Sequence, residues 1–172
     1  MARSIHQFLT GLAGLCLAGG VMHPASADIV IRDVLDPPPA VWAWGSGDIV
    51  ITDSVCVGTD QPGRLRYTIT ATGSGAGGSF FLQGPAPATN DVLSYTVQWN
   101  DRANQTSGVN LTAGTPSSRR ARPTVDLDCR RRGAYTLNAS VIVTIPETGS
   151  TGLLNAPAGA YSGILYLRVA PR

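Results

Sequence analysis

Two aspartates in the segment TVDLDC, Asp126 and Asp128, are the side chains of this protein best suited to chemistry. On a strand, residues two apart point to the same face, and paired carboxylates serve as general acid and base in hydrolases. The same alternation fits a solvated polar face, with Val125 and Leu127 directed into the core. We favour the polar face on this alternation, and a hydrolase that uses carboxylates alone is a remote alternative.

The amino terminus has the three parts of a secretory signal peptide. Arg3 and His6 precede an apolar run over residues 8–21, and the small residues of the motif ASA end at Ala27. The run is shorter than the roughly 20 residues that span a bilayer, which argues against a membrane anchor. We therefore expect residues 1–27 to be a signal peptide that is cleaved after Ala27.

Cleavage would leave a mature chain with few catalytic groups. Both histidines and Cys16 lie in the leader, and the sequence has no lysine. A Ser-His-Asp triad, a Cys-His pair and a Schiff base are therefore excluded, and two thiols give too few ligands for tetrahedral zinc. The two remaining cysteines of an exported protein, Cys56 and Cys129, predict one disulfide. We expect no enzymatic activity, catalytic residue, metal site or cofactor.

The mature chain is long enough for one domain, because about 145 residues remain after cleavage. No window outside the leader has helical periodicity over more than a turn or two, whereas alternating apolar segments recur between loops rich in glycine, proline, serine and threonine. Predicted strands span residues 48–57, 64–72, 79–83, 93–100 and 135–145, followed by a terminal strand. Strands without helices predict an all-β, immunoglobulin-like β-sandwich.

The terminal strand lies in PAGAYSGILYLRVAPR, at the very end of the sequence. Its alternation places Tyr161, Gly163, Leu165, Leu167 and Val169 on one face. An immunoglobulin-like sandwich normally has seven or more strands, so a core strand in this position leaves its outer neighbour missing. We expect an incomplete sandwich with an apolar groove and unpaired backbone groups, to which another strand can add. The alternative is an ordinary core strand in a complete sandwich, which would show the same alternation of residues.

A candidate for the added strand stands at the start of the mature chain, in DIVIRDVLDPPPAVWAWGSG. Residues 28–35 alternate imperfectly, because Arg32 and Asp33 interrupt the two faces, and the prolines at 37–39 predict a stiff spacer. We assign residues 28–47 to an N-terminal extension and residues 48–172 to the sandwich domain. The candidate donor residues are Ile29, Val30, Ile31, Val34 and Leu35. We favour donation to another molecule over the alternative, in which this segment folds back as a strand of its own domain.

Aromatic residues and arginines provide the candidate contact surfaces. Trp42 and Trp44 share a strand face, and we expect core packing there rather than an exposed adhesive or carbohydrate-stacking pair. The arginine clusters comprise Arg119, Arg120 and Arg122, and then Arg130, Arg131 and Arg132. Of the 13 basic residues one is in the leader, which leaves twelve arginines against eleven carboxylates. That balance is too even for a typical nucleic-acid-binding protein, and we expect solvated loops.

Three parts of the sequence stand out together with the signal peptide and the single disulfide: LSYTVQWND followed by LTAG, then DLDCRRRGAYTLNASVIVTIP, and the closing AGAYSGILYLRVAP. These features resemble chaperone–usher pilus subunits, and more narrowly the archaic pilins and spore-coat-U-like proteins. The resemblance covers most of the mature chain and is strongest from Leu93 onward. Gly159 stands at the fourteenth position from the end, as a glycine often does in these pilins, whereas Pro171 replaces their penultimate aromatic residue.

This resemblance implies an incomplete immunoglobulin-like fold that a periplasmic chaperone completes with one strand and a second subunit later completes with its N-terminal extension. It implies a structural subunit of a cell-surface fibre, in adhesion or biofilm formation, with a chaperone, an outer-membrane usher and identical or related subunits as partners. Neither nucleic acid nor a small-molecule substrate is expected. The alternative is a self-contained secreted binding module or tip adhesin, whose contact surface includes Trp42, Trp44 and the arginines. In the fibre subunit residues 28–36 pair with another molecule, and in the binding module they pair within their own sheet.

Overall fold

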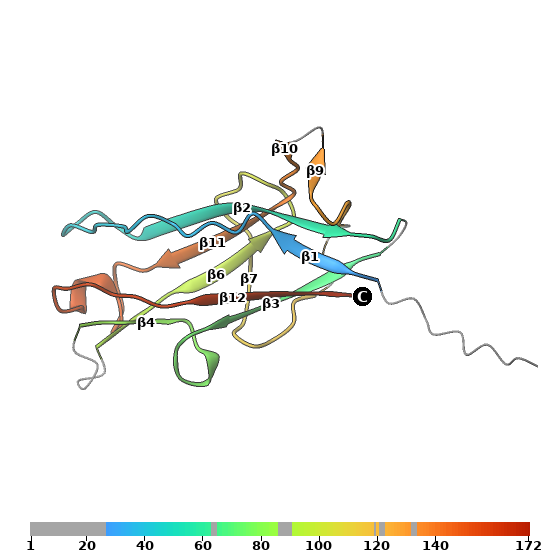
Figure 1. Cartoon of the computed structure of the whole chain (residues 1–172). Coiled ribbons are helices and arrows are strands. Elements are labelled where there is room, and N and C mark those ends of the chain that lie inside the picture. Colours follow the sequence, from blue (N-terminus) through green and yellow to red (C-terminus); the bar gives the residue numbers. More distant parts are fainter. Residues whose placement is uncertain (1–26, 63–64, 86–90, 119, 121–122, 132–133) are drawn as a thin grey trace, which may run out of the picture.

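The computed structural model describes residues 27–62, 65–85, 91–118, 120, 123–131 and 134–172, and it confirms an all-β sandwich (Figure 1). The strands are β1 Ile29–Arg32, β2 Ile49–Thr59, β3 Tyr67–Gly73, β4 Phe81–Gln83, β5 Val92–Ser94, β6 Thr96–Asn100, β7 Val109–Asn110, β8 Thr124–Val125, β9 Arg130–Arg131, β10 Ala134–Tyr135, β11 Ala139–Ile145 and β12 Leu165–Pro171. Two short 3₁₀ turns, η1 Ala76–Gly78 and η3 Leu153–Asn155, join them. Within these ranges no helix has the length and apolarity to cross a membrane.

The strands form two layers (Figure 1). One layer is a six-stranded sheet in the order β1-β2-β11-β6-β7, and β8 adds to β2 in parallel. The other layer contains the antiparallel pair β12-β3 and the hairpin β4-β5, and a bridge between Gln83 and Ser162 links the hairpin to the segment before β12. All ladders except that of β8 are antiparallel, which is consistent with the alternating apolar pattern of the longer strands.

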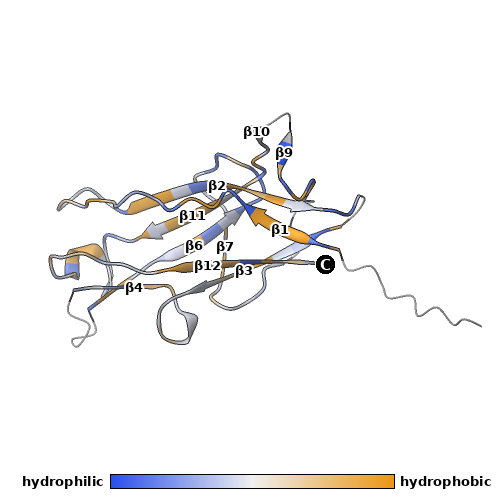
Figure 2. Cartoon of the chain, viewed as in Figure 1, coloured by the Kyte–Doolittle hydropathy of each residue, from blue (hydrophilic) through white to orange (hydrophobic). Residues whose placement is uncertain are grey.

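The core lies between these layers, where apolar residues alternate along the strands (Figure 2). Val55 of β2, Ile69 of β3 and Val97 of β6 are fully buried. Trp99 is also fully buried, and its ring meets that of Tyr67 edge-on at 6.2 Å between centroids. Aromatic pairs in this geometry add to the stabilisation from area burial. The best-packed part of the core therefore lies between β3, β6 and the second half of β2.

A disulfide and an asparagine hold the segment before β11 against β2. Cys56 and Cys129 form the predicted disulfide, and both are fully buried. The Asn138 side chain accepts a hydrogen bond from the N–H of Val57 (2.9 Å), donates one to the Val57 carbonyl (2.9 Å) and donates another to Thr124 Oγ1 (2.8 Å). It thus pairs with β2 just beyond the point where the β11 ladder ends.

Replacing this asparagine is expected to destabilise the fold. Asn138→Ala would leave both backbone groups of Val57 buried without partners, so we expect a loss of about 2–3 kcal/mol in the free energy of unfolding. Urea denaturation measures this change. Asn110→Ala is the matched control, because Asn110 is exposed, and we expect it to change stability by less than about 0.5 kcal/mol. Equal midpoints for the two variants would contradict the assigned role.

Two sequence-based expectations about residues 125–128 are wrong. Val125 is 57% exposed and Leu127 is only half-buried, so neither contributes to the buried core. Val125 ends the two-residue strand β8, and the residues after it form a turn, in which the Asp126 carboxylate accepts the backbone N–H groups of Asp128 (2.9 Å) and Arg130 (3.0 Å). A turn does not place alternate residues on one face, so the strand pattern does not apply there.

Several predicted strands differ in extent. The strand predicted at 93–100 divides into β5 and β6 at Tyr95. The Tyr95 N–H donates to the Phe80 carbonyl (3.0 Å) next to β4, whereas β6 pairs with β11 in the other layer. Regular pairing in the terminal segment begins at Leu165, and the residues before it contact the β4-β5 hairpin. The strands of two residues, β7 to β10, were not predicted, because they are too short for an alternating pattern.

Candidate binding groove

The outer edge of β12 carries unpaired backbone groups. Within the described ranges β12 pairs with β3 alone. Just beyond the end of β12, Arg172 donates its N–H to the Arg66 carbonyl (2.8 Å). In an antiparallel ladder every second residue of a strand bonds to the same neighbour, so the residues of β12 that bond to β3 have even numbers. Leu165, Leu167 and Val169 therefore direct their N–H and C=O groups away from β3.

The side chains of the same three residues face the core but are incompletely covered. Leu165, Leu167 and Val169 are half-buried and contact the core cluster, whereas Ile69 and Ala71 of the neighbouring β3 are 0% exposed. Along β2, Ile49 and Ile51 near the start are likewise half-buried. The sandwich is thus well covered along β3 and incompletely covered along β12.

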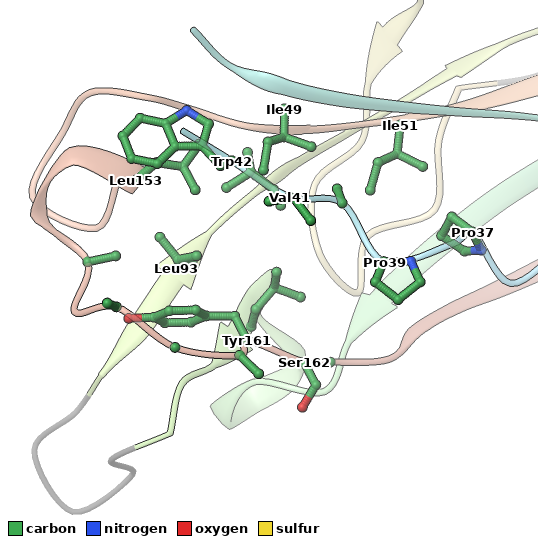
Figure 3. A pocket seen from close by; sticks show the side chains of 18 of the residues that line it. Pro37, Pro39, Val41, Trp42, Ile49, Ile51, Leu93, Leu153, Tyr161 and Ser162 are labelled. Atoms are coloured by element: carbon green, nitrogen blue, oxygen red, sulfur yellow. The ribbon is translucent and has the colours of Figure 1, made fainter. Parts of the chain in front are cut away.

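An apolar groove of about 800 Å³ lies at this incompletely covered end (Figure 3). One wall is the extended chain from Asp36 to Trp44, and the other is the segment from Ala156 to Gly163. Its remaining lining residues are apolar and come from both layers: Ile49, Ile51, Leu82, Leu93, Ile145 and Leu153. The lining ends at Gly163, two residues before the free edge of β12 begins. An apolar groove that leads to a free strand edge suits an extended peptide, which bonds to the edge and inserts alternate side chains.

The first wall belongs to what we call the N-terminal arm, residues 28–44, which follows the edge of β2. Asp33, with φ 61, ends the regular ladder of β1. Beyond it the N–H of Leu35 donates to Asp53 Oδ2 (3.0 Å), and the indole of Trp42 donates to the Gly47 carbonyl (2.9 Å). Loss of solvent raises the pKa of Asp53. The prolines at 37–39 have no N–H, so the arm lies beside β2 without a ladder.

The second wall is fixed to the β4-β5 hairpin. Gln83 and Ser162 exchange backbone hydrogen bonds of 2.8 and 3.0 Å. The Tyr161 hydroxyl donates to the carboxylate of Asp91, which is 6% exposed. Loss of solvent, together with the hydrogen bond to Asp91 and its charge, raises the pKa of Tyr161 to about 12. Gly159 lies against Pro85, whose Cγ would be 2.5 Å from an added Cβ, so a larger residue would displace this wall.

The candidate acceptor residues therefore lie together along one edge. Tyr161 and Gly163 line the groove, and Leu165, Leu167 and Val169 continue along the free edge of β12. Sequence reasoning missed Asp53 and Asp91, which hold the two walls. No local pattern marks either residue, because each acts on a segment that is distant in the sequence.

Three of the five candidate donor residues, Ile29, Val30 and Ile31, are docked on their own domain in the single chain. β1 pairs with β2 from Ile29↔Thr59 to Arg32↔Cys56, which is the fold-back alternative, and Val34 and Leu35 are exposed beyond it. Among the described residues β1 forms no ladder with β12. The fold-back strand therefore does not pair with the free edge of β12.

The two tryptophans have different environments. Trp42 is half-buried and packs against the core cluster, but Trp44 is 79% exposed, so the expectation of core packing is wrong for Trp44. The rings are tilted at 58° with centroids 6.4 Å apart. Trp44 and Gly45 form a turn that the Ser46 N–H closes by donating to the Ala43 carbonyl (3.0 Å), and regular pairing on β2 begins only at Ile49, so no strand face directs the Trp44 ring inward.

The structure describes Arg120, Arg130 and Arg131 of the two arginine clusters. Arg120 is 7% exposed and donates to the Ser118 carbonyl (2.9 Å), contrary to the expected solvated loop. Arg130 is exposed, and together with Arg131 it forms β9. The other members, Arg119, Arg122 and Arg132, lie outside the described residues.

The described residues contain no group of three or more His, Cys, Asp or Glu side chains arranged to hold a metal ion. The groove itself is lined mainly by apolar side chains and prolines. Such a lining offers apolar contact and few polar groups.

Comparison with known proteins finds similarity at the level of the fold alone. No protein-family model matches the sequence, and no curated protein matches it. The structure is similar to a chain of a solved complex described as a chaperone–tip adhesin complex vital for synergistic activation of CFA/I fimbriae biogenesis. The TM-score is 0.50 at 16% sequence identity, and the match covers 86% of this chain but 43% of that chain. The protein thus shares its fold with part of a component of a fimbrial complex.

Proposed function

We propose that this protein is a structural subunit of a cell-surface fibre, and that a strand from another protein completes its sandwich beside β12. The observation that carries the proposal is the free edge of β12, where three residues combine unpaired backbone groups with half-buried apolar side chains next to a groove. A periplasmic chaperone would supply the strand first, and a second subunit would replace it at an outer-membrane usher.

An added strand would contribute hydrogen bonds and apolar burial together. It would pair with the N–H and C=O groups of Leu165, Leu167 and Val169, and it would cover their side chains. Full burial of such a side chain contributes about 1.5–3 kcal/mol, so covering half-buried ones contributes about 1 kcal/mol each. Pro171 has no N–H, so the new ladder would lose a donor beyond Val169. Alternate side chains of the added strand would occupy the groove and determine specificity.

Other features support this role. The resemblance to archaic pilins, the expected signal peptide and the single disulfide fit export through the periplasm to a surface fibre. The fold similarity to part of a fimbrial chaperone–adhesin complex agrees with it. We assign the donor role to residues 28–35 of a second copy, and we assign no catalytic reaction or cofactor to the protein.

Amide hydrogen exchange tests the proposal. Isotope-labelled chain 28–172 is mixed with an unlabelled peptide of sequence DIVIRDVL, and exchange is followed by NMR. We expect the amides of Leu165, Leu167 and Val169 to exchange rapidly in the free chain and to slow at least tenfold with peptide, because they gain strand partners. A peptide with aspartate at both isoleucine positions is the control. Unchanged exchange at all three amides at a saturating peptide concentration would refute the proposed function.

A second candidate is a self-contained binding module. The docking of β1 on its own domain and the exposure of Trp44 favour it. Under this alternative the peptide leaves β12 unchanged, and Trp44→Ala abolishes surface adhesion without altering assembly. The same exchange experiment therefore separates the two candidates.

A further inference from the structure

The seam between β1 and β12 is too narrow for another strand where the two lie side by side (Figure 1). Their Cα atoms approach within 8 Å. Hydrogen-bonded strands are about 4.8 Å apart, so a strand inserted between two others requires about 9.6 Å. The groove at the other end of the seam has the room that this end lacks. A strand that pairs with β12 as far as Val169 therefore requires β1 to move.

The attachment of β1 to β2 is short, because β1 has only four residues and alternate ones bond to β2. Both backbone groups of Val57 bond to Asn138, so they face away from β1. By alternation, Val30 and Arg32 are the residues of β1 that bond to β2. The carbonyl of Asp28 accepts a further hydrogen bond from the Thr59 hydroxyl (2.8 Å).

The apolar side of β1 opposes release. Ile29 and Ile31 are half-buried and pack against the core cluster. A replacing strand would have to cover the same part of the core while it pairs with β12. The candidate donor segment, residues 28–35, carries the same two isoleucines and can provide equivalent cover from a second copy.

We propose that β1 is a latch in cis that closes the carboxyl-terminal end of the β12 edge until an incoming strand displaces it. The inference rests on the proposed function and concerns its regulation. A strand would enter at the groove and extend along β12 as β1 leaves β2. The same displacement frees residues 28–35, so a chain becomes able to donate a strand as it accepts one. A chain with β1 docked neither accepts nor donates a strand.

Reciprocal hydrogen exchange tests the latch in the intact mature chain. With the unlabelled DIVIRDVL peptide, we expect the labelled chain's Val30 and Arg32 amides to lose protection as those of Leu167 and Val169 gain it. Protection of all four amides in the peptide complex would overturn the latch and leave the proposed function standing. If the amides of β12 gain no protection at all, both proposals fail.

A pair of variants provides a second test. Val30→Pro removes the N–H that bonds to β2, so the chain spends more time with β1 undocked and we expect it to bind the peptide about tenfold more tightly. Val30→Ala retains that N–H and removes only the outer part of the side chain, so we expect a change of less than about threefold. The latch is wrong if the two variants bind the peptide with the same affinity. Circular dichroism of both free chains verifies that they remain folded.

Discussion

Removing the disulfide is expected to lower the free energy of unfolding by about 4 kcal/mol, measured by urea denaturation of the mature chain with both cysteines replaced by alanine. Cys56 and Cys129 are 73 residues apart, and in the chain-entropy model a crosslink of this length restricts the unfolded chain by about that amount. Small domains are stable by about 5–15 kcal/mol, so the loss is a large share of the total.

The position of the crosslink adds a local consequence. Cys56 faces Arg32 across the β1-β2 ladder, and Cys129 precedes β9. Without the bond, the turn around Asp126 and the segment leading to β11 would be held to β2 chiefly by Asn138 and β8. The oxidised wild-type chain treated with alkylating reagent alone is the control. A double variant that unfolds at the wild-type urea midpoint would contradict this account.

The long strands could be predicted from the sequence because each has one face against the core. β2, β3, β11 and β12 all lie within or close to the ranges that alternation predicts. The same signal failed at Val125, which is exposed in the two-residue strand β8 before the Asp126 turn, and at Trp44, which lies in the turn with Gly45. Alternation is thus reliable for long strands that have one face against the core, and it fails in two-residue strands and in turns.

The candidate groove was predictable only in part. Alternation identified the face of β12 that lies at the free edge, because the same residues carry the inward side chains and the outward backbone groups. The other wall could not be predicted, since it depends on where the N-terminal arm runs after Asp33 and on the distant Asp53 that holds Leu35. Alternation likewise cannot identify the sheet in which β1 pairs, because a strand shows the same pattern in either place.

Placing a carboxylate in the seam is expected to abolish strand addition. In the free chain Leu167 is half-buried, so an aspartate there retains contact with water at a moderate cost in stability. An added strand would cover the position and leave the charge buried without a partner, which costs several kcal/mol. We therefore expect Leu167→Asp to weaken binding of the DIVIRDVL peptide by more than about 100-fold.

The adjacent residue provides the matched control for this prediction. Arg168 is exposed on the opposite face of β12, so Arg168→Asp introduces the same side chain into the same strand without placing it in the seam. We expect this variant to bind the peptide within about threefold of the wild type. Thermal unfolding of both free variants separates lost binding from lost folding. If folded Leu167→Asp bound the peptide as tightly as Arg168→Asp, the added strand would not cover the inner face of β12. The groove would then bind its ligand without completing the sandwich.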